Sequence, residues 1–238
     1  MKTICIIQAR VGSSRFKGKI LREINNKKII EIIYERLKKS KFINDFVIAI
    51  PDTKENDILN NFLLKKNFKV FRGSEKNVLE RYYLAAKMFK AKVIIRVTSD
   101  CPFINHKIID DHIKIYFRKK KTILSNYLSK SYPLGISFSI CDLNSLRVAY
   151  KNAKDPKEIE HVMPYIYKNF KSSLIKTRYK SNLNRVRLTL DYPADFITIR
   201  KIFNKFSPKI LFDWEEILKI QKKEKSLFKD NFNCVQKK

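Results

Sequence analysis

A loop rich in phosphate-binding residue types follows the first apolar run of the chain. Residues 8–19 read Gln-Ala-Arg-Val-Gly-Ser-Ser-Arg-Phe-Lys-Gly-Lys. Gly12 lets backbone amides approach an anion, and Ser13 adds a hydroxyl donor. Positive charge comes from three further side chains: Arg10, Arg15 and Lys19. In an open α/β sheet, ligands bind beyond the carboxyl ends of the strands, so these residues predict a cradle for a polyphosphate.

Two common phosphate motifs are excluded here. The loop has neither the G-x-x-x-x-G-K-[ST] spacing of a Walker loop nor the G-x-G-x-x-G spacing of a dinucleotide-binding turn. A second interpretation stays open, because an exposed basic loop is ordinary in a chain with 52 Lys and Arg residues. The position of the loop directly after a predicted strand favours phosphate binding.

The elements that must position this loop alternate as in an α/β fold. Short apolar runs predict strands over 4–7, 46–50, 69–71 and 93–97, and helical spacing of apolar residues predicts helices over 28–39, 54–66 and 77–89. This order indicates right-handed β-α-β units and a mostly parallel sheet flanked by helices. Beyond residue 122 the pattern predicts a mixed sheet, with strands over 123–126, 137–141 and 186–190 and a helix near 159–169.

Length and composition predict one domain over residues 1–238. A hydrophobic content of 44% excludes wholesale disorder. We expect a nucleotide-binding half over about 1–121, a sugar-binding half over about 122–218, and a basic tail over 219–238 that forms a fraying helix.

The net charge of +29 does not by itself indicate a nucleic-acid partner, because the lysines are spread along the whole chain. The apolar run at 4–7 is too short for a signal peptide, and no stretch approaches the ~20 apolar residues that span a bilayer. The four cysteines are far apart, which indicates neither a disulfide scaffold nor a zinc site. We therefore expect a cytoplasmic protein without a membrane span.

Six motifs in order resemble the cytidylyltransferases of the spore coat polysaccharide biosynthesis type. They are IIQARVGSSRFKGK at 6–19, RGS at 72–74 with VLERY at 78–82, RVTSDCP at 96–102, YPLG at 132–135, EHVMPY at 160–165 and LTLD at 188–191. The resemblance implies a Rossmann-like, glycosyltransferase-A-like sheet. It also implies an Mg²⁺-dependent reaction in which CTP and an acidic or unusual sugar give a CMP-sugar and pyrophosphate, and it is compatible with a homodimer.

The resemblance also assigns roles to residues. Arg15 and Lys19 would act on the triphosphate, and Asp100 and Asp191 would hold the metal. Nucleotide contacts would come from Gln8, Ala9, Arg10, Gly12, Ser13, Arg72, Gly73, Ser74, Arg96 and Thr98, and sugar contacts from Gly135 and His161. Two loop carboxylates suit Mg²⁺, which binds one or two of them together with phosphate oxygens and water.

Structural alternatives remain for several of these residues. Asp100 can start a turn with Pro102, and Asp191 can cap the helix that begins near Pro193. Ser74 can be a helix N-cap, and His161 can be a buried imidazole. The other two histidines, His106 and His112, are expected at the surface.

The sequence departs from the family pattern mainly in the sugar-binding half. Residues 135–139 read Gly-Ile-Ser-Phe-Ser where Gly-Leu-Asp-Val-Glu is common, so Ser137 and Ser139 replace two carboxylates. Ile159 stands in place of an arginine. A basic, non-catalytic binder of nucleotides or nucleic acid is the alternative function, and an enzyme that uses another nucleoside triphosphate or a sugar 1-phosphate is a third.

Overall fold

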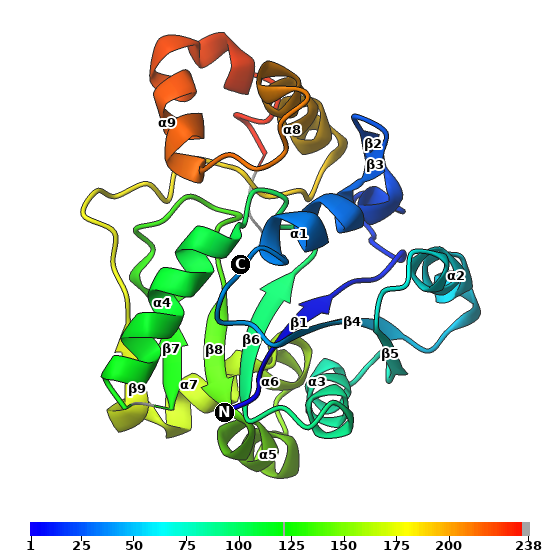
Figure 1. Cartoon of the computed structure of the whole chain (residues 1–238), viewed down its shortest axis with the longest axis vertical. Helices are drawn as coiled ribbons and strands as arrows, with labels where there is room; N and C mark the ends of the chain where they lie inside the picture. Colours follow the sequence, from blue (N-terminus) through cyan, green and yellow to red (C-terminus); the bar gives the residue numbers. More distant parts are fainter. Residues whose placement is uncertain (121, 235–238) are drawn as a thin grey trace.

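A seven-stranded sheet forms the centre of the molecule. The computed structural model describes residues 1–120 and 122–234 (Figure 1). Across the sheet the strands lie in the order β5 (Val70–Gly73), β4 (Asp45–Pro51), β1 (Thr3–Gln8), β6 (Val93–Thr98), β8 (Ser139–Asp142), β7 (Ile123–Ser125) and β9 (Leu174–Lys176). The first four are parallel, whereas β8 is antiparallel to both of its neighbours. The predicted mixed, mostly parallel sheet is confirmed.

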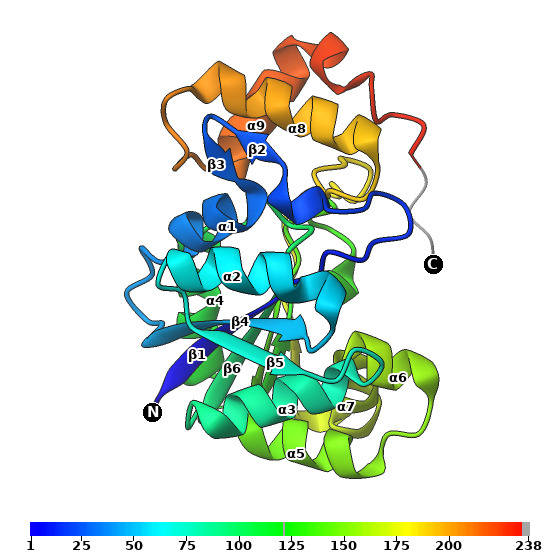
Figure 2. The ribbon, with the colours of Figure 1, turned by 90° about the vertical axis from the view of Figure 1, so that its right-hand side faces the viewer.

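Both faces of the sheet are buried, since successive side chains of a strand point to opposite sides. In β1, Cys5 and Ile7 pack into one core, and Ile4 and Ile6 pack into the other. The first core is covered by α1 (Ile29–Leu37), α2 (Asp57–Lys65) and α4 (His106–Arg118). The opposite face carries α3 (Val78–Met88), α5 (Leu143–Asn152), α6 (Pro156–His161) and α7 (Met163–Asn169) (Figure 2).

Two further helices, α8 (Pro193–Phe206) and α9 (Trp214–Lys223), lie beyond the ends toward which β1 and β6 point (Figure 1). The fully buried guanidinium of Arg36 in α1 joins this part to the sheet, because it donates to the carbonyls of Phe103 and Phe212 at 2.8 Å each. Short elements complete the described chain: β2 (Glu23–Ile24), β3 (Lys27–Lys28), η1 (Lys19–Leu21), η2 (Lys54–Asn56), η3 (Tyr127–Ser129), η4 (Lys171–Ser173) and η5 (Lys225–Phe228). Within the described ranges, the helices are all too short or too polar to cross a bilayer.

The predicted strand over 186–190 is wrong. This segment makes a single bridge, between Arg187 and Leu134, and it is not part of the sheet. The amide of Leu134 donates to the carbonyl of Val186 at 2.9 Å, and the amide of Leu188 donates back to the carbonyl of Leu134 at 2.7 Å. Alternate apolar residues are buried as in a strand, but their neighbour is a loop.

The predicted helix near 159–169 is two helices. Val162 has φ 68°, a left-handed conformation that ends α6. Pro164 then lies in the first turn of α7, where its missing N–H costs no helical hydrogen bond.

The prediction of a fraying helix over 219–238 is wrong for the part that is described, and residues 235–238 lie outside it. Residues 219–223 complete α9, and Phe228 and Asn231 are buried. Asp230 forms an ion pair with Lys201 of α8 at 2.7 Å. The prediction followed from the many lysines of the tail. Its packing depends instead on the buried residues Phe228 and Asn231.

Candidate active site

The loop after β1 is fixed by one buried side chain. The Oδ1 atom of Asn56, which is fully buried, accepts the amide of Val11 at 2.9 Å. The carbonyl of Val11 in turn accepts the amides of Ser13 at 2.9 Å and Gly18 at 3.0 Å. Gly18 has φ 68° and is the N-cap of η1, whose first residue is Lys19. The loop is therefore a defined turn around Val11.

Two cations of this loop converge on Asp191. The Nζ atom of Lys19 lies 3.0 Å from Oδ1 of Asp191 and donates to the carbonyl of Leu190 at 2.5 Å. Nη2 of Arg15 lies 2.8 Å from the same carboxylate oxygen. The side chains of Lys19 and Asp191 are only 11% and 7% exposed, so the interaction is shielded from water. The structure thus brings together three of the four residues expected at the centre of the site.

Asp100, the fourth residue, lies beside Asp191. The carbonyl of Asp100 accepts the amide of Leu190 at 2.9 Å and the hydroxyl of Thr189 at 3.1 Å. These bonds hold the turn after β6 against the segment that ends in Asp191. The cations of the loop and the two aspartates therefore lie at the same edge of the sheet.

The backbone around Asp191 rests on a buried ion pair. Arg187 donates to both oxygens of Asp195 at 2.7 and 2.8 Å, and Oδ2 of Asp195 accepts the amides of Asp191 and Tyr192 at 2.9 Å each. Burial alone would raise the pKa of Asp195, but these hydrogen bonds outweigh it, so the pKa lies below its ordinary value. The N-cap of α8 is Tyr192, and Asp195 at the third helical position accepts its amide, so the alternative in which Asp191 caps this helix is wrong.

The carboxylates of Asp100 and Asp191 are of the ligand type that Mg²⁺ prefers. Oδ1 of Asp100 accepts the hydroxyl of Thr98, while Oδ2 has no partner among the described residues. In the same part of the chain, no group of three or more potential metal ligands occurs. A metal held here would need phosphate or water oxygens for its remaining positions, as is usual for Mg²⁺.

The predicted nucleotide contacts on β1 and β6 are neighbours. Gln8 pairs in register with Thr98, and Oε1 of Gln8 accepts a long hydrogen bond of 3.4 Å from Arg96. The hydroxyl of Thr98 is bound to Asp100. Ala9 is buried, and its amide already donates to the carbonyl of Ala49 at 3.1 Å.

Arg10, Gly12 and Ser13 also lie on the loop. The exposed guanidinium of Arg10 makes no hydrogen bond or ion pair with any described residue, so it is available to a ligand. A Cβ atom at Gly12 would lie 2.5 Å from Oε2 of Glu55, which shows how closely this carboxylate approaches the loop. Glu55 also forms an ion pair with Lys17 at 2.8 Å.

Arg72, Gly73 and Ser74 follow the edge strand β5. The guanidinium of Arg72 forms ion pairs with Asp52 at 2.8 Å and Asp57 at 2.7 Å, so it binds α2 and the turn before it. The N-cap alternative for Ser74 is wrong, since Asn77 caps α3 by accepting the amide of Glu80 at 2.8 Å. The Oγ atom of Ser74 instead accepts the amide of Asn77 at 3.0 Å.

The two predicted sugar contacts have different surroundings. Gly135 has φ 94°, and a Cβ atom there would lie 2.5 Å from the backbone of Leu188, so the glycine is needed for close packing. His161 is exposed at the end of α6, which corrects the alternative of a buried imidazole. Ser139, which replaces a family carboxylate, is the cross-strand neighbour of Arg96 and shares a hydrogen bond of 2.5 Å with the hydroxyl of Tyr167.

A hollow of about 430 Å³ lies elsewhere, between α4 and α9, and contains none of the predicted site residues. His112 lines it and is buried, so its expected place at the surface is wrong. Its Nδ1 atom is 2.7 Å from the carbonyl of Ile108, and its Nε2 atom is 3.3 Å from the hydroxyl of Tyr132. The apolar side of α4 faces the core at this position.

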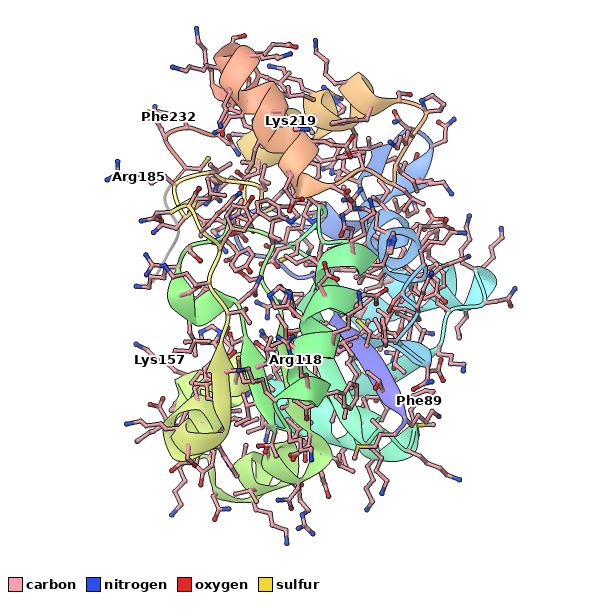
Figure 3. The ribbon with its side chains drawn as sticks, turned by 60° about the vertical axis from the view of Figure 1, so that its left-hand side comes forward. Phe89, Arg118, Lys157, Arg185, Lys219 and Phe232 are labelled. Atoms are coloured by element: carbon pink, nitrogen blue, oxygen red, sulfur yellow. The ribbon has the colours of Figure 1, made fainter. Side chains whose placement is uncertain are left out.

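Basic side chains occur on several different elements of the molecule. Figure 3 labels Arg118 of α4, Lys157 of α6, Lys219 of α9 and Arg185 of the loop before Asp191, which lie in separate parts of the molecule. A continuous basic surface along one face is typical of nucleic-acid binding.

The sheet, with its loop after β1, has the fold of a nucleotidyltransferase. A solved cytidylyltransferase from Leptospira borgpetersenii serovar Hardjo-bovis (strain JB197) has a TM-score of 0.90 to this chain, with 28% identity and 100% of both chains covered. The family model of the cytidylyltransferases matches residues 4–231, and the chain belongs to this family.

Two relatives are similar to the chain over most of its length. The spore coat polysaccharide biosynthesis protein SpsF of Bacillus subtilis is 32% identical over 208 residues, which cover 84% of this chain and 85% of the relative. An uncharacterized protein of Methanocaldococcus jannaschii is 35% identical over 240 residues, which cover 100% of this chain and 97% of the relative. The chain is therefore an enzyme of the spore-coat type, and a purely non-catalytic binder is set aside.

The sequence did not reveal the residues that support the site. Asn56 and Asn231 are single polar residues without a local pattern. Asp195 had a signal, because a proline at the first position of a helix and an acid at its third are typical of a helix start.

Proposed function

We propose that this enzyme transfers the cytidylyl group of CTP to a sugar, releases pyrophosphate and depends on Mg²⁺. The observation that supports this most is the convergence of Lys19 and Arg15 on Asp191, next to Asp100. A polyphosphate carries several negative charges close together. A site that binds it needs cations and backbone amides that are held in place before it binds.

The loop after β1 is the part that binds the triphosphate. An ammonium group has three N–H donors, and two of those of Lys19 are used by Asp191 and the carbonyl of Leu190. The third has no partner among the described residues and can bind a phosphate oxygen. The N–H groups of Arg15 that do not contact Asp191 can also bind phosphate, and so can the guanidinium of Arg10, which has no partner among the described residues.

The reaction is an in-line displacement at the α-phosphorus. A sugar hydroxyl oxygen forms the new bond to phosphorus while the bond from the α-phosphorus to the bridging oxygen breaks. Pyrophosphate leaves with that electron pair, and the hydroxyl proton passes to water. Lys19 and Arg15 orient the phosphates and stabilise the charge that develops on the leaving group. Mg²⁺ held by Asp100 and Asp191 would neutralise further phosphate charge.

The acceptor is proposed to be an acidic or unusual sugar of a surface polysaccharide. This rests on the family and on the relative that is named for spore coat polysaccharide biosynthesis. The residues at 137 and 139 are serines, so the acceptor half lacks two carboxylates of the family pattern. An acidic sugar would meet less repulsion there than in relatives that keep both carboxylates.

The proposal is tested by measuring pyrophosphate release from CTP, with Mg²⁺ and a panel of neutral and acidic sugars, and by identifying the CMP-sugar by mass spectrometry. Thermal unfolding with CTP, UTP, GTP or ATP tests the base, because a ligand that binds only the folded state raises the melting temperature. CTP is expected to raise it most, and Mg²⁺ is expected to increase the shift. Equal shifts with all four nucleotides, or turnover with another one, would contradict the assignment of CTP.

A further inference from the structure

One buried residue of the C-terminal segment reaches the candidate active site. Asn231 is 2% exposed, although both of its neighbours in sequence are exposed. Phe232, labelled in Figure 3, is 85% exposed. A polar side chain that is buried between exposed neighbours is held by specific contacts, since burial without hydrogen bonds is unfavourable.

The contacts of Asn231 lead directly to the backbone that carries Asp191. Its Nδ2 atom donates to Oδ1 of Asp195 at 3.0 Å, with a longer contact of 3.4 Å to the carbonyl of Arg187. The other oxygen of Asp195 accepts the amides of Asp191 and Tyr192. One carboxylate therefore joins the C-terminal segment to the turn that presents Asp191.

We propose that Asn231 is a positioning residue, which fixes Asp195 and through it the orientation of the Asp191 carboxylate toward Lys19 and Arg15. This inference rests on the proposed function, and it assigns a role in that reaction to the segment after α9. Asn231 does not touch the phosphate-binding loop in the structure; it acts through Asp195.

The geometry requires a donor at this place. Oδ1 of Asp195 is shared between Nε of Arg187 and Nδ2 of Asn231, so both sides of the oxygen are occupied by N–H groups. Without the amide, Oδ1 of Asp195 keeps one donor, Nε of Arg187, and any shift of the carboxylate moves the amides of Asp191 and Tyr192 that Oδ2 accepts. A carboxylate in place of the amide has the same shape but donates nothing, and it repels Asp195.

The test compares Asn231→Ala and Asn231→Asp with Asp230→Ala. Asp230 is adjacent in sequence and pairs with Lys201 at the surface, so its removal perturbs the same segment without touching Asp195. Two experiments are made on the full chain. Steady-state kinetics give kcat and KM for CTP. The electron paramagnetic resonance signal of free Mn²⁺ gives the affinity for Mn²⁺ in the presence of CTP and without sugar. Melting temperatures establish that each variant is folded at the assay temperature.

We expect Asn231→Ala to lower kcat and to weaken Mn²⁺ binding by about tenfold each, as is usual when a group that orients a metal ligand is lost. At saturating metal, KM for CTP should change less than kcat, since Asn231 itself contacts Asp195 and Arg187 and not the phosphate-binding loop. Asn231→Asp should be worse than Asn231→Ala. If the side chain at position 231 only filled space, Asn231→Asp would be milder than Asn231→Ala, because Asp has the shape of Asn.

Wild-type values for Mn²⁺ binding and kcat in Asn231→Ala would overturn the inference and leave the proposed function standing. A wild-type protein that binds no Mn²⁺ with CTP and shows no turnover would overturn the proposed function, and this inference with it.

Discussion

The ammonium group of Lys19 lies 3.0 Å from the carboxylate of Asp191, although 172 residues separate them in the chain. Arg15 contacts the same oxygen, so two cations share one buried carboxylate. This arrangement keeps both cations at the edge of the sheet before a nucleotide arrives, which lowers the reorganisation that binding requires. The same carboxylate is the proposed metal ligand, so binding of a metal and release of the cations toward phosphate are expected to be coupled.

Replacement of Lys19 by methionine should lower kcat by about 10²-fold or more, because a positioned stabiliser of phosphate charge is lost while the apolar stem is kept. Lys17→Met is the matched control, since Lys17 lies on the same loop but is exposed and pairs with Glu55. Initial rates of pyrophosphate release provide the measurement. Similar losses in both variants would indicate a general effect of loop charge and not a specific role of Lys19.

Asp100→Asn should reduce metal-dependent turnover by about 10²-fold while the protein stays folded, because an amide oxygen is a weaker ligand for Mg²⁺ than a carboxylate. Asp111→Asn controls for the loss of one negative charge, since Asp111 lies exposed on α4 and pairs with Lys114. Titration of Mg²⁺ against rate separates a metal effect from other causes. Full activity of Asp100→Asn at ordinary Mg²⁺ concentrations would remove Asp100 from the site.

The parts of this site that could be predicted from the sequence are those whose characteristic residues lie close together in the chain. The loop after β1 combines glycines, serines and cations within twelve positions, and the preceding apolar run identifies the strand that carries it. Asp100 and Asp191 were suggested by resemblance, because nothing local distinguishes a ligand from a turn or capping aspartate.

Other features depend on contacts between distant segments. Residues 186–190 alternate like a strand, yet they pack on the loop at Leu134 and carry Asp191 to the site without joining the sheet. Burial of Asn231 is decided by Asp195, which is 36 residues away in sequence. The alternation of apolar residues in 186–190 identifies neither the partner nor one buried side, since Arg187 and Thr189 are buried as well.

Asn56→Ala should raise KM for CTP and lower stability. The substitution leaves the buried amide of Val11 without its acceptor, which costs about 1–3 kcal/mol of unfolding free energy. The loop then samples other conformations, and binding must restore the native one. Asn61→Ala serves as control, because Asn61 is exposed on α2. Steady-state kinetics and urea denaturation check both effects, and an unchanged KM would show that the loop is held without Asn56.

Acidification should destabilise the protein through His112. Burial lowers the pKa of this imidazole, so at pH values below about 6.5 the unfolded chain binds a proton that the folded protein does not. The unfolding free energy must therefore decrease as the pH falls from about 7 toward the lowered pKa. His112→Gln should show a smaller decrease over this range than the wild type, whereas His161→Gln, at an exposed position, should not. Denaturation curves at pH 7.5 and 5.5 give the comparison, and identical decreases in His112→Gln and the wild type would contradict this explanation.

Gly135→Ala should destabilise the fold more than Gly18→Ala does. Both glycines have positive φ, 94° and 68°, so alanine costs about 1–2 kcal/mol of backbone strain at either position. At Gly18 a Cβ atom would meet nothing within 4 Å, whereas at Gly135 it would lie 2.5 Å from the carbonyl carbon of Leu188. Backbone atoms cannot move aside as a flexible side chain can, so the segment that carries Asp191 must shift away from the loop at Leu134. Urea denaturation should give a loss of about 3 kcal/mol or more for Gly135→Ala, and equal losses in the two variants would mean that these segments are not closely packed.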